Sequence, residues 1–244
     1  QNIEHTAEKN FGSRKAPTPD MVKKIFAVLK AKIFVQKENE IIAVFNHYNM
    51  RMWHFLLLFT AARPVSDFPG FLKSFSLKRK ILMVSDKEIG GRQGYGRLIP
   101  LCNFVVQEME KFIQFLDFFK IQIGPHHPEI QDNIQQIMEN KLPLLNIFSQ
   151  EKWQTLSPSI VNNFNPELGL KYENWHRHTA RAFLSNKISE PEILALFGHE
   201  PMQQEAAHPY SSLAISQYLS IAPILEQMKD HFEITGIELH VLIQ

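Results

Sequence analysis

The switch from helical to strand-like spacing at residues 81–101 constrains this fold more than any other feature of the sequence. Apolar residues at 81–84 and 98–101 flank a glycine-rich stretch, which predicts an antiparallel β-hairpin. The apolar spacing is helical over residues 40–62 before the hairpin and over residues 102–120 after it. We therefore predict an α+β protein that is mainly helical and carries a small antiparallel β-sheet.

Further helices are predicted toward both ends of the chain. The first begins near Thr18, and Thr18 and Asp20 are its candidate caps. After residue 174 the pattern predicts three helices joined by loops, and Ser189–Glu192 (SEPE) has the form of a capping box with proline in the first turn. Residues 121–170 predict loops around one or two helices, and the final IELHVLIQ alternates as a strand does.

Composition sets the broad class of the protein. The chain of 244 residues is 44% hydrophobic and 21% charged, which is ordinary for a globular protein with a sizeable core. Its one cysteine, Cys102, excludes an internal disulfide and favours a reducing compartment, here the cytoplasm. The longest uninterrupted apolar run, FLLLF at residues 55–59, is far too short to cross a bilayer, so we expect no membrane partner.

Charge is divided unevenly along the sequence. Residues 1–100 hold 17 Lys and Arg against 8 Asp and Glu, whereas the remainder holds 9 against 17. The first part thus carries a formal net charge of +9 and the rest carries −8. A basic half in an otherwise balanced protein indicates contact with a polyanion on one face.

The densest group of histidines and arginines is NWHRHTARAFL, residues 174–184. His176 and His178 are two residues apart, so on a helix they point to different sides and cannot share one metal ion. No carboxylate or cysteine stands at a standard ligand spacing nearby. We therefore predict no metal site and instead favour phosphate chemistry, to which the fork of an arginine guanidinium is suited.

Groups suited to phosphate chemistry recur along the whole chain. Two arginines can hold the non-bridging oxygens of one phosphate and stabilise the charge that builds up in the transition state. A lysine or histidine can protonate a leaving oxygen, and a tyrosine hydroxyl can attack phosphorus. The candidates of these types are Arg63, Lys87, Arg177, His178, His199 and Tyr210.

The order of these residues resembles the catalytic domain of the tyrosine recombinases, the phage integrase family. In that family an arginine follows a threonine-containing helix, as in TAARPVSD around Arg63, and a hairpin carries a lysine and closes on a strand similar to GRLIPL at residues 96–101. An Arg-His-Thr box, a Gly-His pair and a tyrosine follow in the same order. The resemblance spans about residues 18–229, and it implies the tyrosine recombinase catalytic-domain fold for residues 18–244, with residues 1–17 as a linker or N-terminal arm.

The resemblance implies a chemical role for each matched residue. Tyr210 would attack a scissile DNA phosphate and form a 3′-phosphotyrosine link, while Arg63 and Arg177 hold the non-bridging oxygens. Lys87 would protonate the 5′-oxygen leaving group, and His199 would donate a hydrogen bond to the phosphate. The implied reaction uses no metal and no cofactor, and its partner is double-stranded DNA. Further contacts to DNA are predicted for Lys78, Arg79, Lys80, Arg92, Arg97 and His178.

The arginine of the box has two candidates. Arg177 stands 22 residues before His199, which matches the family spacing, whereas Arg181 stands only 18 residues before it, so we choose Arg177. Position 174, where the family usually has histidine, is asparagine, which cannot take a proton. Asn174 then either only positions the phosphate or leaves His176 to act in place of the missing histidine.

The nucleophile also has two candidates. Tyr210 stands 33 residues after Arg177, close to the family's habit, although the 11 residues from His199 to Tyr210 make a slightly long loop. Tyr218 falls within a helical apolar pattern, so we expect it to pack in the core. We therefore choose Tyr210.

Two alternative functions use the same fold. Asn174 and the long tyrosine loop motivate a DNA-binding module with weakened catalysis, and the shared chemistry also allows DNA relaxation like that of a type IB topoisomerase. Family members usually carry an N-terminal DNA-clamping domain, and residues 1–17 are too few to form one, so we expect a catalytic fragment. The strand-like tail is either donated to a neighbouring subunit, as four protomers assemble on DNA, or packed on its own domain.

Overall fold

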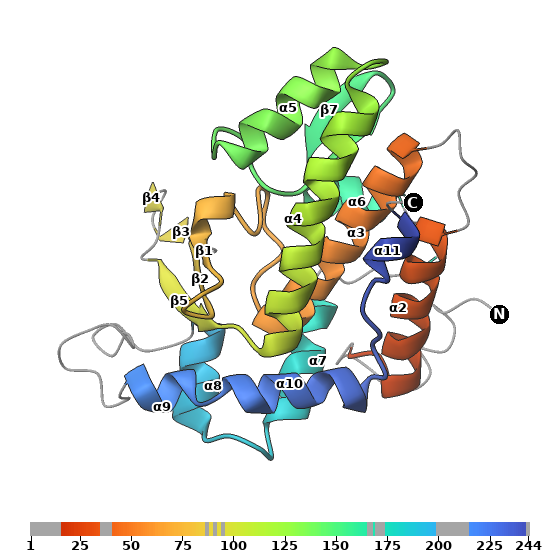
Figure 1. Cartoon of the computed structure of the whole chain (residues 1–244). Coiled ribbons are helices and arrows are strands. Elements are labelled where there is room, and N and C mark those ends of the chain that lie inside the picture. Colours follow the sequence, from red (N-terminus) through yellow and green to blue (C-terminus); the bar gives the residue numbers. More distant parts are fainter. Residues whose placement is uncertain are drawn as a thin grey trace.

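Figure 1 shows the chain as a computed structural model, in which a small sheet flanks a group of upright helices and the horizontal helix α10 lies beneath them. Helices predominate and the sheets are small and antiparallel, which confirms the predicted mainly helical α+β class. The structure describes residues 16–34, 41–85, 88–89, 92–93, 96–164, 168, 174–198 and 215–242.

The elements follow the order of the sequence. The helices in the described ranges are α2 (Pro19–Phe34), α3 (Ile41–Thr60), α4 (Asn103–Ile123), α5 (Pro128–Met138), α6 (Pro158–Phe164), α7 (Trp175–Leu184), α8 (Glu190–Phe197), α9 (Ile215–Leu219), α10 (Ala222–His231) and α11 (Leu239–Leu242). The strands are β1 (Phe75–Ser76), β2 (Ile81–Val84), β3 (Glu88–Ile89), β4 (Arg92–Gln93), β5 (Arg97–Pro100), β6 (Asn146–Ser149) and β7 (Lys152–Thr155), and the short 3₁₀ turn η1 (Leu72–Ser74) precedes β1.

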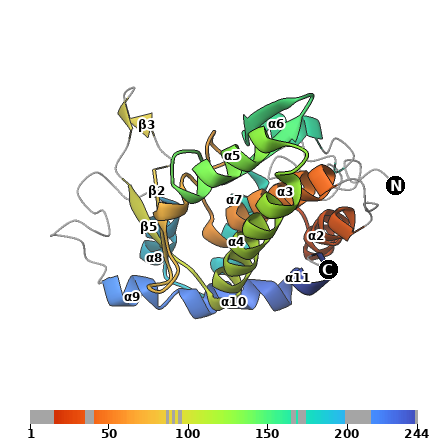
Figure 2. The ribbon, with the colours of Figure 1, turned by 45° about the horizontal axis from the view of Figure 1, so that its top comes forward.

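α3 is the central helix of the core. Nearly all of its side chains from Phe45 to Thr60 are buried, which is expected for a helix that other elements cover on every side. Helices α2, α4 and α7 and the strand β6 pack around it, and Figure 2 shows α3 running behind α4 with α2 beside it. The helix predicted over residues 40–62 is confirmed, and it ends at Thr60.

The predicted hairpin forms two of the three strands of the larger sheet. β2 and β5 pair antiparallel, with Ile81 opposite Pro100 and Val84 opposite Arg97, and β1 joins the other edge of β2. Between them along the chain, β3 and β4 form a separate two-stranded pair. β4 therefore falls inside the glycine-rich stretch that marked the hairpin in the sequence.

A second hairpin, β6–β7, was not predicted within residues 121–170. Its strand β6 pairs with β7 and is also held by amide side chains of α3. Asn46 donates to the Phe148 carbonyl at 2.8 Å and accepts from the Phe148 N–H at 2.8 Å, while the Asn49 side chain accepts from the Asn146 N–H at 3.1 Å. These bonds satisfy polar groups that would otherwise be buried unpaired against the core.

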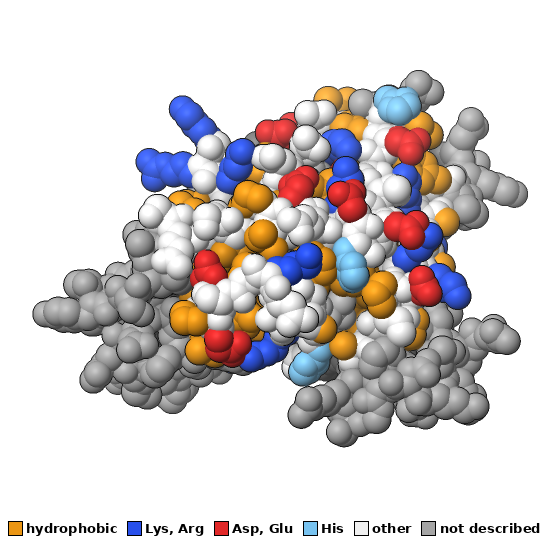
Figure 3. Space-filling view, turned by 90° about the horizontal axis from the view of Figure 1, so that it is seen from below, with side chains coloured by type: hydrophobic (Ala, Val, Ile, Leu, Met, Phe, Trp, Pro, Cys, Tyr) orange, Lys and Arg blue, Asp and Glu red, His pale blue; other side chains and the backbone are white. Residues whose placement is uncertain are grey.

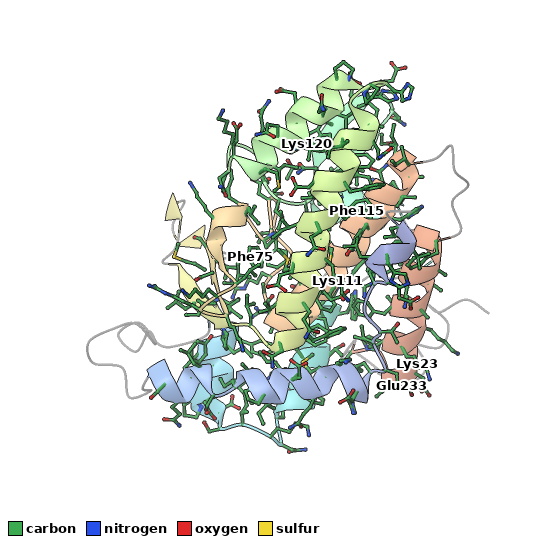
Figure 4. All side chains as sticks on the ribbon, viewed as in Figure 1. Lys23, Phe75, Lys111, Phe115, Lys120 and Glu233 are labelled. Carbon is green, nitrogen blue, oxygen red and sulfur yellow. The ribbon has the colours of Figure 1, made fainter. Side chains whose placement is uncertain are left out.

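The strand predicted at the C-terminus is wrong, because residues 239–242 form the helix α11. Leu239 and Leu242 both pack on the core and stand three residues apart, a spacing that one helical turn brings to the same side. Figure 4 shows Lys23 of α2 close to Glu233, with which it forms an ion pair. The C-terminal segment thus packs on its own domain.

A buried ionic group holds the same segment and is called here the Arg51 centre. Arg51 of α3 donates to the Glu108 carboxylate of α4 at 3.1 Å and to the Thr235 carbonyl at 2.8 Å. Glu108 also accepts from the Ile237 N–H at 3.0 Å and from the Lys111 ammonium at 2.7 Å. The side chains of Arg51 and Glu108 are both fully buried, so the segment is fastened by charges that water does not reach.

Two predicted helix starts agree with the structure, although the described residues after 174 form five helices, α7 to α11, where three were predicted. The Thr18 hydroxyl accepts from the Met21 N–H at 3.3 Å at the start of α2. At α8 the Glu192 carboxylate accepts from the Ser189 N–H at 2.7 Å, which is one arm of the expected capping box, and from the Ser189 hydroxyl at 2.6 Å.

The surface seen from below mixes both signs of charge. Figure 3 shows acidic, basic and apolar side chains interspersed over this face, so it presents no continuous basic area where it is described. Within the part of the chain that the structure describes, no helix combines the length and the apolar character needed to span a membrane.

Candidate functional site

Arg177 lies in the first turn of α7, and its side chain is 7% exposed. Its Nη1 donates to the Ala61 carbonyl at 2.5 Å, and its Nη2 donates to the Phe197 carbonyl at 2.9 Å. Ala61 directly follows α3, and Phe197 is the last residue of α8. The guanidinium therefore holds the carboxyl ends of two helices together, where carbonyls lack helical partners and a cation is favoured. We call this group the Arg177 centre.

The Arg177 centre brings three of the predicted segments to one place. Ala61 stands two residues before Arg63, and Phe197 stands two residues before His199. Arg63 itself is half-buried and lies in the turn after α3, where its carbonyl accepts from the Val65 N–H at 2.9 Å. Arg177, the third predicted phosphate ligand, thus holds the main chain two residues before each of the other two.

Local sequence explains why α3 stops where it does. The Thr60 hydroxyl donates to the Leu56 carbonyl at 2.6 Å, and Ala61 takes a left-handed conformation with φ of +49°. Pro64 follows and cannot continue a helix. The chain therefore leaves the core at Arg63, close to the helix end that the sequence predicted.

The Phe197 ring contributes to the Arg177 centre from α8. The Arg177 guanidinium lies over this ring at 4.8 Å from its centroid, within the range of a cation–π interaction. Arg181, the competing candidate, lies farther from the ring at 6.0 Å and donates to the Glu190 carboxylate at 2.7 Å in an ion pair at the surface. The two arginines of the cluster thus occupy different settings, because Arg177 is buried among carbonyls whereas Arg181 is half-buried and paired with a carboxylate.

A pair of buried histidines lies beside the Arg177 centre. His54 of α3 and His176 of α7 place their Nδ1 and Nε2 atoms 2.8 Å apart, and the Trp175 ring stacks on His176 with 3.8 Å between centroids. Burial lowers the pKa of His54 to about 4, because the charged ring would lose its hydration. His176 is thus directed into the core, which argues against its acting in place of the histidine missing at position 174.

Asn174 and His178 lie on the exposed side of α7. Asn174 is the N-cap residue, and its carbonyl accepts from the Arg177 N–H at 3.1 Å and the His178 N–H at 3.2 Å. Both side chains are exposed. Asn174 therefore stands one helical turn from His178, at the N-terminal end of the helix that carries Arg177.

The strand β5 meets the same end of α8. Arg97 donates from Nη1 to the Leu196 carbonyl, the neighbour of the carbonyl that Arg177 holds. Tyr218 of α9 is buried, and its hydroxyl donates to the Leu98 carbonyl at 2.7 Å. The expectation that Tyr218 packs in the core is confirmed.

The predicted DNA-contact residues fall into separate places. Lys78 and Arg79 are exposed in the turn between β1 and β2, and Lys80 follows them with its ammonium donating to the Asn103 side chain at 2.7 Å. Arg92 belongs to the short strand β4, and its side chain is outside the described part. Three predicted catalytic residues, Lys87, His199 and Tyr210, also lie outside the described residues.

Sequence reasoning did not find His54, Phe197 or the carbonyl of Ala61. A histidine within an otherwise apolar helical run was the available signal for His54, because a polar ring at such a position needs a buried partner. Phe197 and Ala61 contribute ring or main-chain contacts, which depend on where α8 and α3 end. Neither residue type by itself indicates such a contact.

These features define the class as a mainly helical α+β protein in which a buried arginine holds two helix ends beside a small antiparallel sheet. A scan against protein-family models finds no family that matches the chain, and a search of curated proteins finds no significant relative. Chemically, the described arrangement presents one guanidinium bonded to two helix-end carbonyls, and Arg63 stands two residues beyond the first of them.

Proposed function

We propose that this protein is a tyrosine-type site-specific DNA recombinase, which cuts and rejoins strands through a 3′-phosphotyrosine link. The observation that carries the proposal is the pair of bonds from Arg177 to the Ala61 and Phe197 carbonyls at 2.5 and 2.9 Å. These bonds bring the chain next to Arg63 and the chain next to His199 to the residue that the recombinase resemblance selects. The tyrosine recombinase fold belongs to the same proposal.

The proposed reaction conserves the energy of the phosphodiester bond. The Tyr210 hydroxyl gives up its proton to water as its oxygen attacks the scissile phosphorus, a bond from tyrosine to the 3′-phosphate forms, and the bond to the 5′-oxygen breaks. Lys87 gives a proton to that 5′-oxygen, and His199 donates a hydrogen bond to the phosphate. A 5′-hydroxyl of a second DNA end then reverses the step, so the chemistry draws on no cofactor.

The role of the arginines follows from charge. Arg63 and Arg177 would hold the two non-bridging oxygens, on which negative charge increases in the transition state. Arg177 is 7% exposed, so water screens its charge less than it screens an arginine at the surface. Its geometry is set before the substrate arrives, because its bonds to two chain ends restrict the side chain.

The proposed partner is double-stranded DNA. Lys78 and Arg79 are exposed at the turn of the sheet and would contact the phosphate backbone, with Lys80 beside them. We further propose that four protomers assemble on the DNA and that the protein acts in the cytoplasm, where that DNA is found.

A specific observation favours a second candidate function, a DNA-binding module with weakened catalysis. Asn174 cannot accept a proton, and His176 is buried against His54 at 2.8 Å. Neither position therefore supplies the proton acceptor that the resemblance leads one to expect. Relaxation of DNA like that of a type IB topoisomerase would share the chemistry of the first proposal.

The experiment captures the covalent intermediate. Duplexes are selected from a random pool by binding, nicked next to each candidate cleavage position, and incubated with the protein at saturating concentration. We expect a protein–DNA adduct that survives denaturing electrophoresis and is lost in Tyr210→Phe. The matched control is Tyr218→Phe, which removes the buried hydroxyl and should retain the adduct. Strong binding without any adduct from the wild-type protein would overturn the recombinase proposal in favour of the binding module.

A further inference from the structure

Arg97 stands at the start of β5, and its guanidinium reaches the end of α8 and donates to the Leu196 carbonyl. Leu196 is the residue before the last in α8, so its carbonyl is among those that have no partner within the helix. A cation at this end also interacts favourably with the helix dipole. The contact therefore meets two general requirements of a helix end at once.

Gly198 shows independently that the Arg97 side chain and the α8 end are closely fitted. Gly198 has a left-handed φ of +61°, and a Cβ added to it would lie 3.1 Å from both Cδ and Nε of Arg97. Its N–H donates to the Ala195 carbonyl at 3.1 Å, which closes the last turn of α8. Glycine thus lets the main chain pass directly over the Arg97 side chain.

The same helix end is held from a second side by Arg177. Arg97 and Arg177 bond the carbonyls of two consecutive residues, Leu196 and Phe197. β5 is itself fixed to α9 through the bond from Tyr218 to the Leu98 carbonyl at 2.7 Å. Arg97 therefore joins the sheet to the group that the recombinase proposal uses for catalysis.

We propose that Arg97 is a positioning residue for strand cleavage and not a contact to the DNA backbone. It fixes the end of α8 against β5, so that Arg177, which bonds the same helix end, keeps its register with the hairpin. This inference rests on the proposed recombinase function. It replaces the assignment of Arg97 to DNA contact that its basic charge had suggested.

The two roles differ in how they respond to salt. A side chain that neutralises one phosphate contributes about 0.9 to the slope of log affinity against log salt concentration. A positioning residue contributes nothing to that slope, but its loss slows the chemical step on DNA that is already bound, since small displacements of reacting groups are costly. Salt dependence and single-turnover rate therefore separate the two roles.

The experiment compares Arg97→Gln with two matched arginine variants. Arg79→Gln removes an exposed arginine from the sheet turn, and Arg181→Gln removes a half-buried arginine from α7. DNA affinity is measured between 50 and 200 mM salt, and adduct formation is measured at saturating DNA with the duplexes selected above. We expect Arg97→Gln to keep the wild-type salt slope and to slow adduct formation about tenfold or more. Arg79→Gln should lower the slope by about 0.9, and Arg181→Gln should leave the rate unchanged.

A measurement without DNA tests the role of Arg97 independently of the proposed recombinase function. Hydrogen exchange of the last turn of α8 should become about tenfold faster in Arg97→Gln, while exchange in α5 stays unchanged. A wild-type protein that forms no adduct would sink the recombinase proposal, and the exchange result would still report whether Arg97 fixes α8.

Three outcomes would overturn the positioning role of Arg97. The first is a salt slope lowered by about 0.9 with a wild-type rate of adduct formation, which would assign Arg97 to a phosphate. The second is unchanged exchange at the end of α8. The third is global unfolding of both Arg97→Gln and Arg97→Lys, seen as loss of helical circular dichroism, which would make Arg97 a residue of overall stability.

Discussion

The Arg51 centre and the Arg177 centre both use a buried arginine to hold chain segments, and they do so with different partners. Arg51 is fully buried and bonds a carboxylate, Glu108, at 3.1 Å together with the Thr235 carbonyl at 2.8 Å. Arg177 is 7% exposed, and its bonds to Ala61 and Phe197 go to main-chain carbonyls. One centre fastens the C-terminal segment, whereas the other holds the helix ends that adjoin the candidate site.

The difference in partners determines what each centre contributes to stability and to the geometry of the site. A buried ion pair is stable only while both charges are present, because each was removed from water at high cost. Bonds from a guanidinium to carbonyls restrict chain ends without depending on a second buried charge. We therefore expect changes at the Arg51 centre to act on the stability of the whole protein, and changes at the Arg177 centre to act more on the geometry of the site.

The largest effect is expected from Arg51→Met. This change leaves the fully buried Glu108 with Lys111 as its one charged partner among the described residues, so we expect a loss of about 3 kcal/mol in the free energy of unfolding. Arg177→Met removes hydrogen bonds of about 1 kcal/mol each and should cost about 2 kcal/mol. Urea denaturation of both variants measures the two losses. An equal loss at the two positions would contradict the distinction between the centres.

Two controls accompany this comparison. The double variant Arg51→Met, Glu108→Leu removes both charges and should recover most of the stability lost in the single variant. Lys23→Met breaks the ion pair with Glu233, whose side chains are 48% and 63% exposed, and should change stability by less than about 1 kcal/mol.

A pH effect of comparable size is expected beside the Arg177 centre. Burial lowers the pKa of His54 to about 4 from the usual histidine value of 6.5, so the unfolded chain binds this proton more readily than the folded protein does. Stability from His54 is therefore fully present above pH 6.5 and is lost as the pH falls toward 4, by about 1.4 kcal/mol per pH unit and about 3 kcal/mol in all.

Comparison with His54→Gln isolates this effect, because glutamine keeps a polar group toward His176 but does not titrate. Denaturation is measured for both proteins between pH 7.5 and 4. The wild-type protein should lose more stability than the variant over this range. Parallel curves for the two proteins would show that the His54–His176 pair does not set the acid limit of the fold.

A smaller effect is expected from Gly236→Ala at the Arg51 centre. A Cβ at this position would lie 2.5 Å from a Glu108 carboxylate oxygen and 3.1 Å from the Lys111 nitrogen, so the ionic group must shift. We expect a loss of about 2 kcal/mol, which is typical of overpacking. Gly96→Ala is the matched control, since its nearest neighbours would be at 3.5 and 3.7 Å. Equal melting temperatures for the two variants would mean that the C-terminal segment is held more loosely than its contacts indicate.

The elements that the sequence predicted correctly depend on local spacing. The helix ending at Thr60 and the pairing of β2 with β5 follow from apolar periodicity and a glycine-rich stretch. The hairpin β6–β7 and the helix α11 were missed because distant side chains decide their form. Asn46 holds β6 from 102 residues away, and Glu108 holds the N–H of Ile237 from 129 residues away.

The candidate site shows the same limit. Order and spacing selected Arg63 and Arg177, but the bond from Arg177 to the Ala61 carbonyl joins positions 116 residues apart. His54 and His176 are 122 residues apart, so their pairing also depends on how α3 and α7 pack. Arg97 illustrates the converse, because its charge suggested a contact to DNA whereas its position on β5 directs it to α8.

Among the variants at the candidate site, the smallest effect is expected from Tyr218→Phe, which tests the side of the Arg177 centre that faces the sheet. The change removes one buried hydroxyl that donates to the Leu98 carbonyl at 2.7 Å, so we expect a loss of about 1 kcal/mol in the free energy of unfolding. Because the ring still fills its place in the core, the fold should remain, and circular dichroism should be unchanged. Adduct formation on saturating DNA should also persist, since Tyr218 is buried and bonded to the strand. Loss of the adduct in Tyr218→Phe, with its retention in Tyr210→Phe, would reverse the choice of nucleophile and require α9 to leave β5 before cleavage.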